Sequence, residues 1–185
     1  METYKNLKKG TKIGLIISAA LCVVALLGEI MSFVRLNNSN PQAIIFVCLR
    51  IVIVMGTIVY TLVGYKKPHG NMLRATLFIF AGFLGTVALT AYNGINGFLS
   101  MVAAITVSYI AGRLNKIEKN RILLVIVGVL LLSGQIAEII HANSQNAFVA
   151  INILLPLIIF TALAFSYTAR YEQHKAAGLE DKQDA

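Results

Sequence analysis

The chain has 185 residues, enough for one domain, and its composition excludes a water-soluble fold. Hydrophobic residues make up 57% of it and charged residues only 13%, whereas soluble domains are closer to half apolar and a quarter charged. The net charge of +8 does not indicate nucleic-acid binding, because the basic residues lie at the ends of apolar runs and form no continuous patch. The excess apolar surface is therefore expected to face a lipid bilayer.

Six apolar runs approach or exceed the roughly 20 residues that a membrane-spanning helix needs. They predict transmembrane helices over residues 13–34, 43–64, 72–92, 95–112, 122–141 and 147–168. The runs are continuous rather than alternating, which excludes barrel strands. Because the polar connections are short, successive helices are expected to be antiparallel. The predicted fold is an all-α integral membrane protein, with six transmembrane helices arranged as three helical hairpins in one domain over residues 1–170.

The run over residues 13–34 follows a basic segment, but it exceeds the roughly 7–15 residues of a signal-peptide core and predicts a retained helix. Small residues recur at every fourth position: Gly14, Ser18 and Cys22. This spacing lets helices approach closely. It predicts packing within the bundle or, alternatively, docking of a partner subunit or of a second copy. Near the outer end of the run lies an acidic residue, Glu29.

The next runs carry further exceptions to their apolar character. Residues 43–64 contain Arg50, about seven residues from the predicted outer end. Residues 95–112 repeat the small-residue spacing, which again predicts close packing, at Ala104, Ser108 and Gly112. Cys22 and Cys48 are isolated from other thiols and from histidine, so they predict buried apolar side chains rather than a metal site.

The last two runs are also interrupted. Residues 122–141 contain Gln135 and Glu138 and end at His141, and residues 147–168 contain Asn152. Pro156 removes a backbone hydrogen bond near the middle of its helix and predicts a kink, which suits a cavity. Residues 171–185 are expected to form a disordered cytoplasmic tail.

The distribution of basic residues predicts the orientation. Of the 16 Lys and Arg residues, Arg50 lies within a helix and Arg35 alone falls on the side opposite the termini. Because positive charge accumulates in cytoplasmic segments, the N- and C-termini are predicted to be cytoplasmic. The expected location is the cell membrane, as a multi-pass protein of a bacterial inner or plasma membrane.

The charged residues predict a polar layer in the outer half of the bundle. Glu29, Arg50 and Glu138 lie at similar predicted depths, and the planar fork of an arginine is suited to bridging carboxylates. The layer is extended by neighbouring polar residues: Gln135, Asn152 and His141. Two interpretations remain open, a structural ion-pair network and a ligand-binding site.

The hypothesis that follows is a small-solute binding or transport component whose ligand is polar or charged. The first alternative is a non-transporting membrane subunit or scaffold whose buried charges are structural. A membrane-embedded enzyme is third, because no nucleophile or metal ligand accompanies the two carboxylates, and no catalytic motif such as H-E-x-x-H or Walker A is present. No cofactor is predicted, since paired histidines for haem are missing from the apolar runs.

In size, helix count and predicted cytoplasmic termini, the chain resembles in outline the substrate-binding S components of energy-coupling-factor vitamin transporters. The resemblance implies a solute site within the six helices and a membrane partner that meets the small residues of the first helix. The chain departs from that pattern in its short first external loop, residues 35–42, and in having no matching ligand motif.

Overall fold

The computed structural model describes residues 7–35, 41–64, 70–91, 93–114, 117–142 and 147–176. Within these ranges the chain is helical, which confirms the predicted all-α class. The helices are α1 (Lys9–Arg35), α2 (Pro41–Gly64), α3 (Gly70–Thr90), α4 (Gly94–Gly112), α5 (Ile117–Ala142) and α6 (Ala147–Ala176). Five of the six are long and apolar enough to cross a membrane; the exception is α2, whose described apolar stretch is Ile44–Val59. These five helices fit a multi-pass membrane protein.

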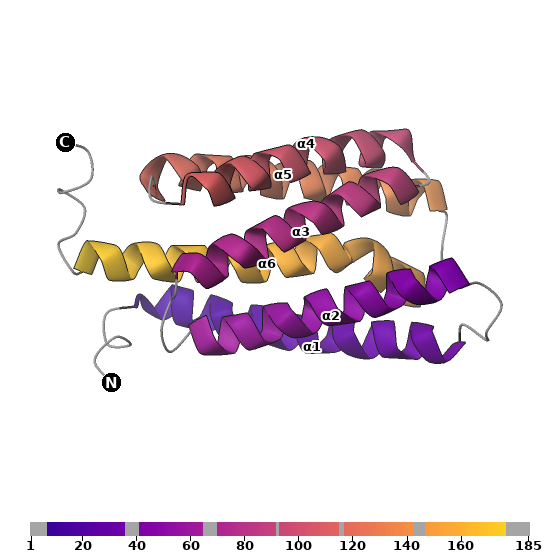
Figure 1. Ribbon diagram of the computed structural model, residues 1–185, viewed down its shortest axis with the longest axis horizontal. Helices are drawn as coiled ribbons and strands as arrows, with labels where there is room; N and C mark the ends of the chain where they lie inside the picture. The colour runs from indigo at the N-terminus through magenta and orange to yellow at the C-terminus, as the bar shows by residue number, and fades with distance from the viewer. Residues whose placement is uncertain are drawn as a thin grey trace.

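Successive helices run in opposite directions along one long axis (Figure 1). The pairs α1–α2, α3–α4 and α5–α6 are each in contact, as expected for hairpins, and α4 also packs along α5. Helix α6 has the central place, because it contacts α1, α2, α3 and α5. We call the end where α1 begins and α6 ends the terminal end, and the end where α1 stops and α2 begins the distal end.

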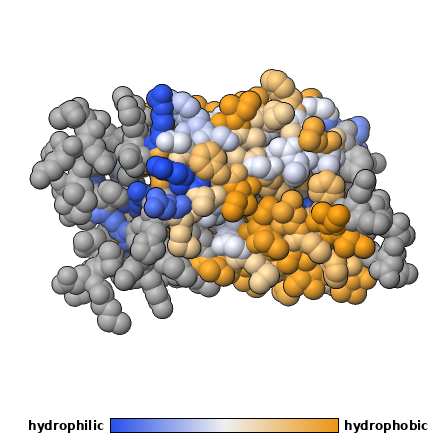
Figure 2. Space-filling view, viewed as in Figure 1, coloured by the Kyte–Doolittle hydropathy of each residue, from blue (hydrophilic) through white to orange (hydrophobic). Residues whose placement is uncertain are grey.

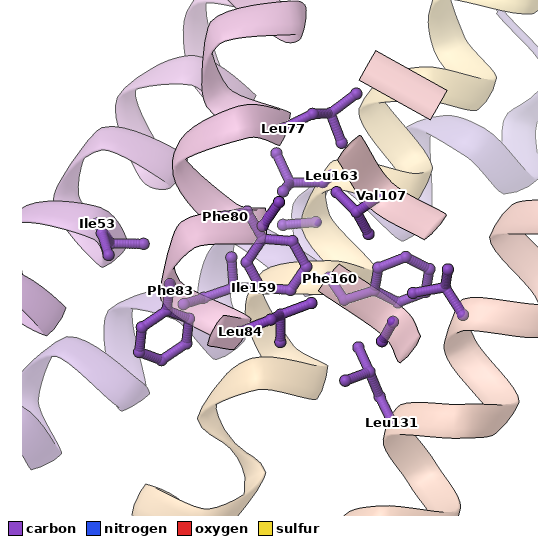
Figure 3. Close-up of a cluster of buried hydrophobic side chains, with 14 of the residues drawn as sticks. Ile53, Leu77, Phe80, Phe83, Leu84, Val107, Leu131, Ile159, Phe160 and Leu163 are labelled. Carbon is purple, nitrogen blue, oxygen red and sulfur yellow. The ribbon is translucent and has the colours of Figure 1, made fainter. Parts of the chain in front are cut away.

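The core forms where α3, α4 and α6 meet (Figure 3). Leu77, Phe80 and Leu84 of α3 are at most 1% exposed, and their spacing of three and four residues places them on one face of the helix. Phe80 stacks against Phe160 of α6, with ring centroids 6.3 Å apart and planes inclined by 25°. Aromatic burial therefore fixes α6 against α3 in the middle of the bundle.

The outer surface is apolar over most of its length. Exposed large hydrophobic side chains occur on α1 to α5, whereas the described residues of α6 contribute none. In Figure 2 hydrophilic side chains gather towards the terminal end of the visible face, and hydrophobic ones cover much of the remainder. A surface of this kind is stable in lipid and unstable in water.

Helix α1 packs along α6, and the small residues of α1 allow the two helices to approach closely. A Cβ atom added to Gly14 would collide with the ring of Phe165 in α6. Ser18 and Cys22 are fully buried on the same face. The small-residue series of α1 therefore packs inside the bundle, which is the first of the two predicted alternatives.

The equivalent series on α4 packs less completely than expected. Ala104 is buried and Ser108 half-buried, but Gly112 is exposed and a Cβ atom there would meet nothing within 4 Å. The prediction of close packing at Gly112 is wrong, because the buried face of α4 near this end is formed by Ile110 and Ala111 instead.

The carboxylate of Glu172, near the end of α6, binds the start of α1. It accepts hydrogen bonds from the backbone N–H of Lys8, at 2.8 Å, and from the hydroxyl of Thr11, at 2.7 Å. The first N–H groups of a helix lack intrahelical partners and lie at the positive end of its dipole, so a carboxylate stabilises them. The first and last helices are thus joined at the terminal end.

Helices α1, α5 and α6 are each several residues longer than the apolar runs that predicted them, and α1 begins at Lys9 rather than 13. Helix α5 begins at Ile117 rather than 122, and α6 continues to Ala176 rather than 168. Hydropathy predicts only the apolar segment of a helix. The helix itself continues through charged residues, which also have a high helix propensity. The first residues of the predicted tail are consequently helical, and those after 176 lie outside the described part of the chain. Pro156 lies inside α6, whose N-terminal part bends away from the rest in Figure 1.

The contact between Gly14 and Phe165 can be tested by filling the space at the glycine. Gly14→Leu is expected to destabilise the protein by about 2 kcal/mol, the usual cost of overpacking. The measurement is the thermal unfolding midpoint in detergent. Gly82→Leu is the matched control, because no atom lies within 4 Å of a Cβ at that position. Equal midpoints for the two variants would contradict the close approach of α1 to α6.

Candidate functional site: a polar cavity at the distal end

The first element of the site is an ion pair between α1 and α2. Arg50 Nη1 donates to Glu29 Oε1 at 3.4 Å. Glu29 is only 1% exposed, whereas the Arg50 side chain is 33% exposed. The predicted partnership of these two residues is therefore present. Because a guanidinium has five N–H donors, the bond to Glu29 leaves most of them for other acceptors.

The second element is Glu138 of α5, whose carboxylate lies beside the start of α4. Its Oε2 accepts hydrogen bonds from the backbone N–H of Asn93, at 3.1 Å, and from Asn96 Nδ2, at 3.2 Å. The sequence predicted that Arg50 bridges both carboxylates. In the structure Arg50 pairs with Glu29, and Glu138 anchors the N-terminus of α4, where the helix dipole favours a negative charge.

Asn96 is held firmly in this arrangement. Its Oδ1 accepts a hydrogen bond from Ser100 Oγ at 3.3 Å, while its Nδ2 donates to Glu138. On the side of α5, a Cβ atom at Gly134 would lie 2.7 Å from Asn96 Oδ1, so only glycine fits there. Close contact between α4 and α5 thus fixes the amide group.

A cavity of about 280 Å³ lies between these two elements. Helices α2, α3, α5 and α6 supply most of its wall, and the start of α4 completes it. The residues that line this distal cavity are Phe46, Leu49, Arg50, Phe83, Thr86, Val87, Thr90, Ala91, Asn96, Glu138, Ala142, Ile153 and Pro156. The lining includes the last residues of α3 and α5, which places the cavity in the distal half of the bundle.

The wall combines apolar side chains with hydrogen-bond donors and acceptors. Arg50 of α2 contributes a cation with unused donors. Glu138 of α5 contributes a carboxylate, beside the amide of Asn96. Thr86 and Thr90 of α3 also line the cavity, and they donate their hydroxyl protons to backbone carbonyls, at 2.7 and 2.9 Å, so their oxygens can still act as acceptors. A few placed polar groups in an apolar pocket are typical of small-molecule sites.

Two buried oxygens near this layer have no hydrogen-bond donor among the described residues: Glu29 Oε2 and Gln135 Oε1. Gln135 is 2% exposed and precedes Glu138 by one turn of α5, but it does not line the cavity. A buried acceptor without a donor costs about 1–3 kcal/mol. These two atoms are therefore the places where the interior would accept a bound water.

The remaining predicted site residues lie elsewhere. His141 is exposed in the last turn of α5 and does not line the cavity. Asn152 belongs to α6, but its side chain is outside the described part of the structure. The structure adds Thr86 and Thr90, for which the sequence contains no signal, because a threonine in a membrane helix normally satisfies its own hydroxyl. Pro156 lines the cavity, in agreement with the expectation that its kink suits one.

The anchoring role of Glu138 gives a testable prediction. Glu138→Ala leaves Asn93 N–H and Asn96 Nδ2 without their acceptor and is expected to cost about 2 kcal/mol or more. Glu138→Gln retains one amide oxygen and is expected to cost less. Thermal unfolding in detergent measures both. His141→Ala, on the same helix but exposed, is the control and should leave the midpoint unchanged. A Glu138→Ala variant as stable as the control would contradict the anchoring role.

Within the described ranges, no group of three or more His, Cys, Asp or Glu side chains is placed to hold a metal ion. Comparisons of the chain with protein-family models, with curated proteins and with solved structures give no significant match.

Proposed function

We propose that the chain is a six-span protein of the cell membrane, with cytoplasmic termini, that binds a small polar solute in the distal cavity. In this orientation the distal end faces the outside, and the protein acts as a binding or transport component. The basic residues at the terminal end support the orientation. The cavity volume of about 280 Å³ restricts the ligand to a small molecule.

The observation that carries the proposal is the position of Arg50. Its buried counter-ion, Glu29, does not line the cavity, whereas Arg50 itself does. The ion pair lowers the cost of placing a cation in the bundle, and Arg50 keeps N–H donors that this bond does not use. A guanidinium with free donors suits a carboxylate or phosphate oxygen. The preferred ligand is therefore a small solute that carries such an acceptor group.

One observation favours the alternative of a structural scaffold. Glu138 is already engaged by two donors of α4, and it is 5% exposed. Its role in packing α4 against α5 needs no ligand. The same argument does not extend to Arg50, because its single hydrogen bond to Glu29 is long for a charge-assisted bond, which normally measures about 2.7–2.9 Å. The two residues are thus assigned different roles, and separate experiments address them.

The outward opening of the cavity can be tested by cysteine labelling in intact cells. In a Cys22→Ala, Cys48→Ala background, Thr86→Cys is expected to react with a membrane-impermeant thiol reagent added outside. Val52→Cys, which is 64% exposed on the apolar surface of α2, is the control and should not react, because lipid excludes the reagent. Absence of reaction at Thr86→Cys would indicate a dry cavity. Reaction only from the cytoplasmic side would reverse the orientation.

The role of Arg50 can be separated from its contribution to stability. Arg50→Ala strands the buried Glu29 and is expected to cost about 3 kcal/mol or more. The double variant Arg50→Gln, Glu29→Gln removes both charges, keeps a hydrogen-bonding pair, and should recover most of that loss. The measurement is the unfolding midpoint with and without a panel of amino acids, dicarboxylates and organic phosphates.

In the wild type at least one of these compounds should raise the midpoint, and the double variant should lose this response while remaining folded. If no compound acts on the wild type, or if the double variant responds equally, Arg50 does not serve binding.

A further inference from the structure

A second cavity lies on the outside of the bundle between α5 and α6, and none of its lining residues also lines the distal cavity. It has a volume of about 660 Å³ and is lined by Arg121, Ile122, Leu124, Val125, Gly128, Phe160, Ala164 and Thr168. We call it the α5–α6 groove. No described residue of another helix lines it, so it opens outward rather than into the bundle. From Arg121 to Gly128 it follows α5 for about 10 Å, at 1.5 Å per residue.

The groove has an apolar floor and an apolar rim. Leu124 and Phe160 are buried at its floor, while Ile122 and Val125 are exposed at its edge. Small residues keep it open: a Cβ atom at Gly128 would already lie 3.2 Å from the ring of Phe160. In a bilayer this space would be filled by hydrocarbon, because water gains no hydrogen bonds on such a surface.

Arg121 gives the groove a charged end. It lies one turn from the start of α5, near the terminal end, and its guanidinium carbon is 4.7 Å from the centroid of the Tyr171 ring. The ring covers one face of the guanidinium group, which leaves the N–H groups at the edge of that group available for hydrogen bonding. Among the described residues no carboxylate pairs with Arg121. The groove is therefore amphiphilic: a cation with free donors at one end and an apolar channel leading away from it.

We propose that the α5–α6 groove binds an anionic phospholipid, with its phosphate at Arg121 and an acyl chain along Leu124, Gly128 and Phe160. Charge complementarity selects the headgroup, since no carboxylate among the described side chains pairs with Arg121 and basic sites between membrane helices attract anionic headgroups. The polar-to-apolar order along the groove matches that of a lipid from headgroup to chain. A packing helix would not require a cation at one end of its contact. The site is separate from the distal cavity, and its lipid is independent of any solute bound there.

The test compares two lipids on the full-length protein in detergent. Dioleoyl phosphatidylglycerol is expected to raise the unfolding midpoint and to be retained in native mass spectra, whereas dioleoyl phosphatidylcholine should do so weakly. Arg121→Gln should weaken phosphatidylglycerol retention by about fivefold, the contribution expected of one basic residue at the surface. Inorganic phosphate alone should have no effect, because it lacks the chain that occupies the groove.

Arg113→Gln is the matched control. Arg113 also stacks on a tyrosine, with its guanidinium carbon 4.7 Å from the Tyr109 ring, but it does not line the groove. This variant should retain phosphatidylglycerol like the wild type. Equal loss in both variants would overturn the proposal in favour of diffuse attraction to the basic end, and so would equal retention of the two lipids by the wild type.

Ala164→Leu tests the chain-binding part without changing charge. It should reduce phosphatidylglycerol retention while Arg121 remains in place. Unchanged retention would show that the lipid does not enter the groove. If instead the wild type is a dimer without added lipid, and Ala164→Leu makes it monomeric, the groove holds a second copy of the chain and the lipid assignment is wrong.

Discussion

The ion pair between Glu29 and Arg50 is the interaction on which the polar interior depends. In hydrocarbon no water compensates a buried charge, so each charged group needs a partner within the bundle. Glu29 is almost fully buried on α1, and Arg50 reaches it from α2 at 3.4 Å. This pairing permits a guanidinium to remain on the wall of the distal cavity. The same pair joins the first two helices, so the chemistry of the cavity and the packing of the first hairpin are linked.

Glu138, the second buried carboxylate, is stabilised by different groups. It accepts hydrogen bonds at the start of a helix, where the backbone N–H of Asn93 and the side-chain amide of Asn96 supply two donors. Glycine at position 134 allows α5 to approach closely enough for this contact. The two carboxylates that look equivalent in the sequence therefore have different partners. One neutralises a charge beside the cavity, and the other fixes the short connection between α3 and α4.

The positions of the helices were predictable from the sequence because an apolar run is a local property. The predicted ends of the helices were less accurate, because α5 and α6 continue into charged segments that are helical without being hydrophobic. The partner of Arg50 was predictable, since few carboxylates lie at its depth. The partners of Glu138 were not, because a backbone N–H is present at every residue and leaves no mark in the sequence. Thr86 and Thr90 were missed for a related reason: they resemble any threonine in a membrane helix until the tertiary structure places them at a cavity.

The contact between Glu172 and the start of α1 has a consequence for how the protein is made. Thr11 and Glu172 are 161 positions apart, so α1 completes its contacts only after α6 has been synthesised. The partner of Gly14, Phe165, also belongs to α6. Until then α1 can pair with α2, and the groove that α6 will occupy along it stays filled by lipid. Insertion of α6 therefore closes the bundle, and a chain that stops before this helix lacks the central element against which α1, α2, α3 and α5 pack.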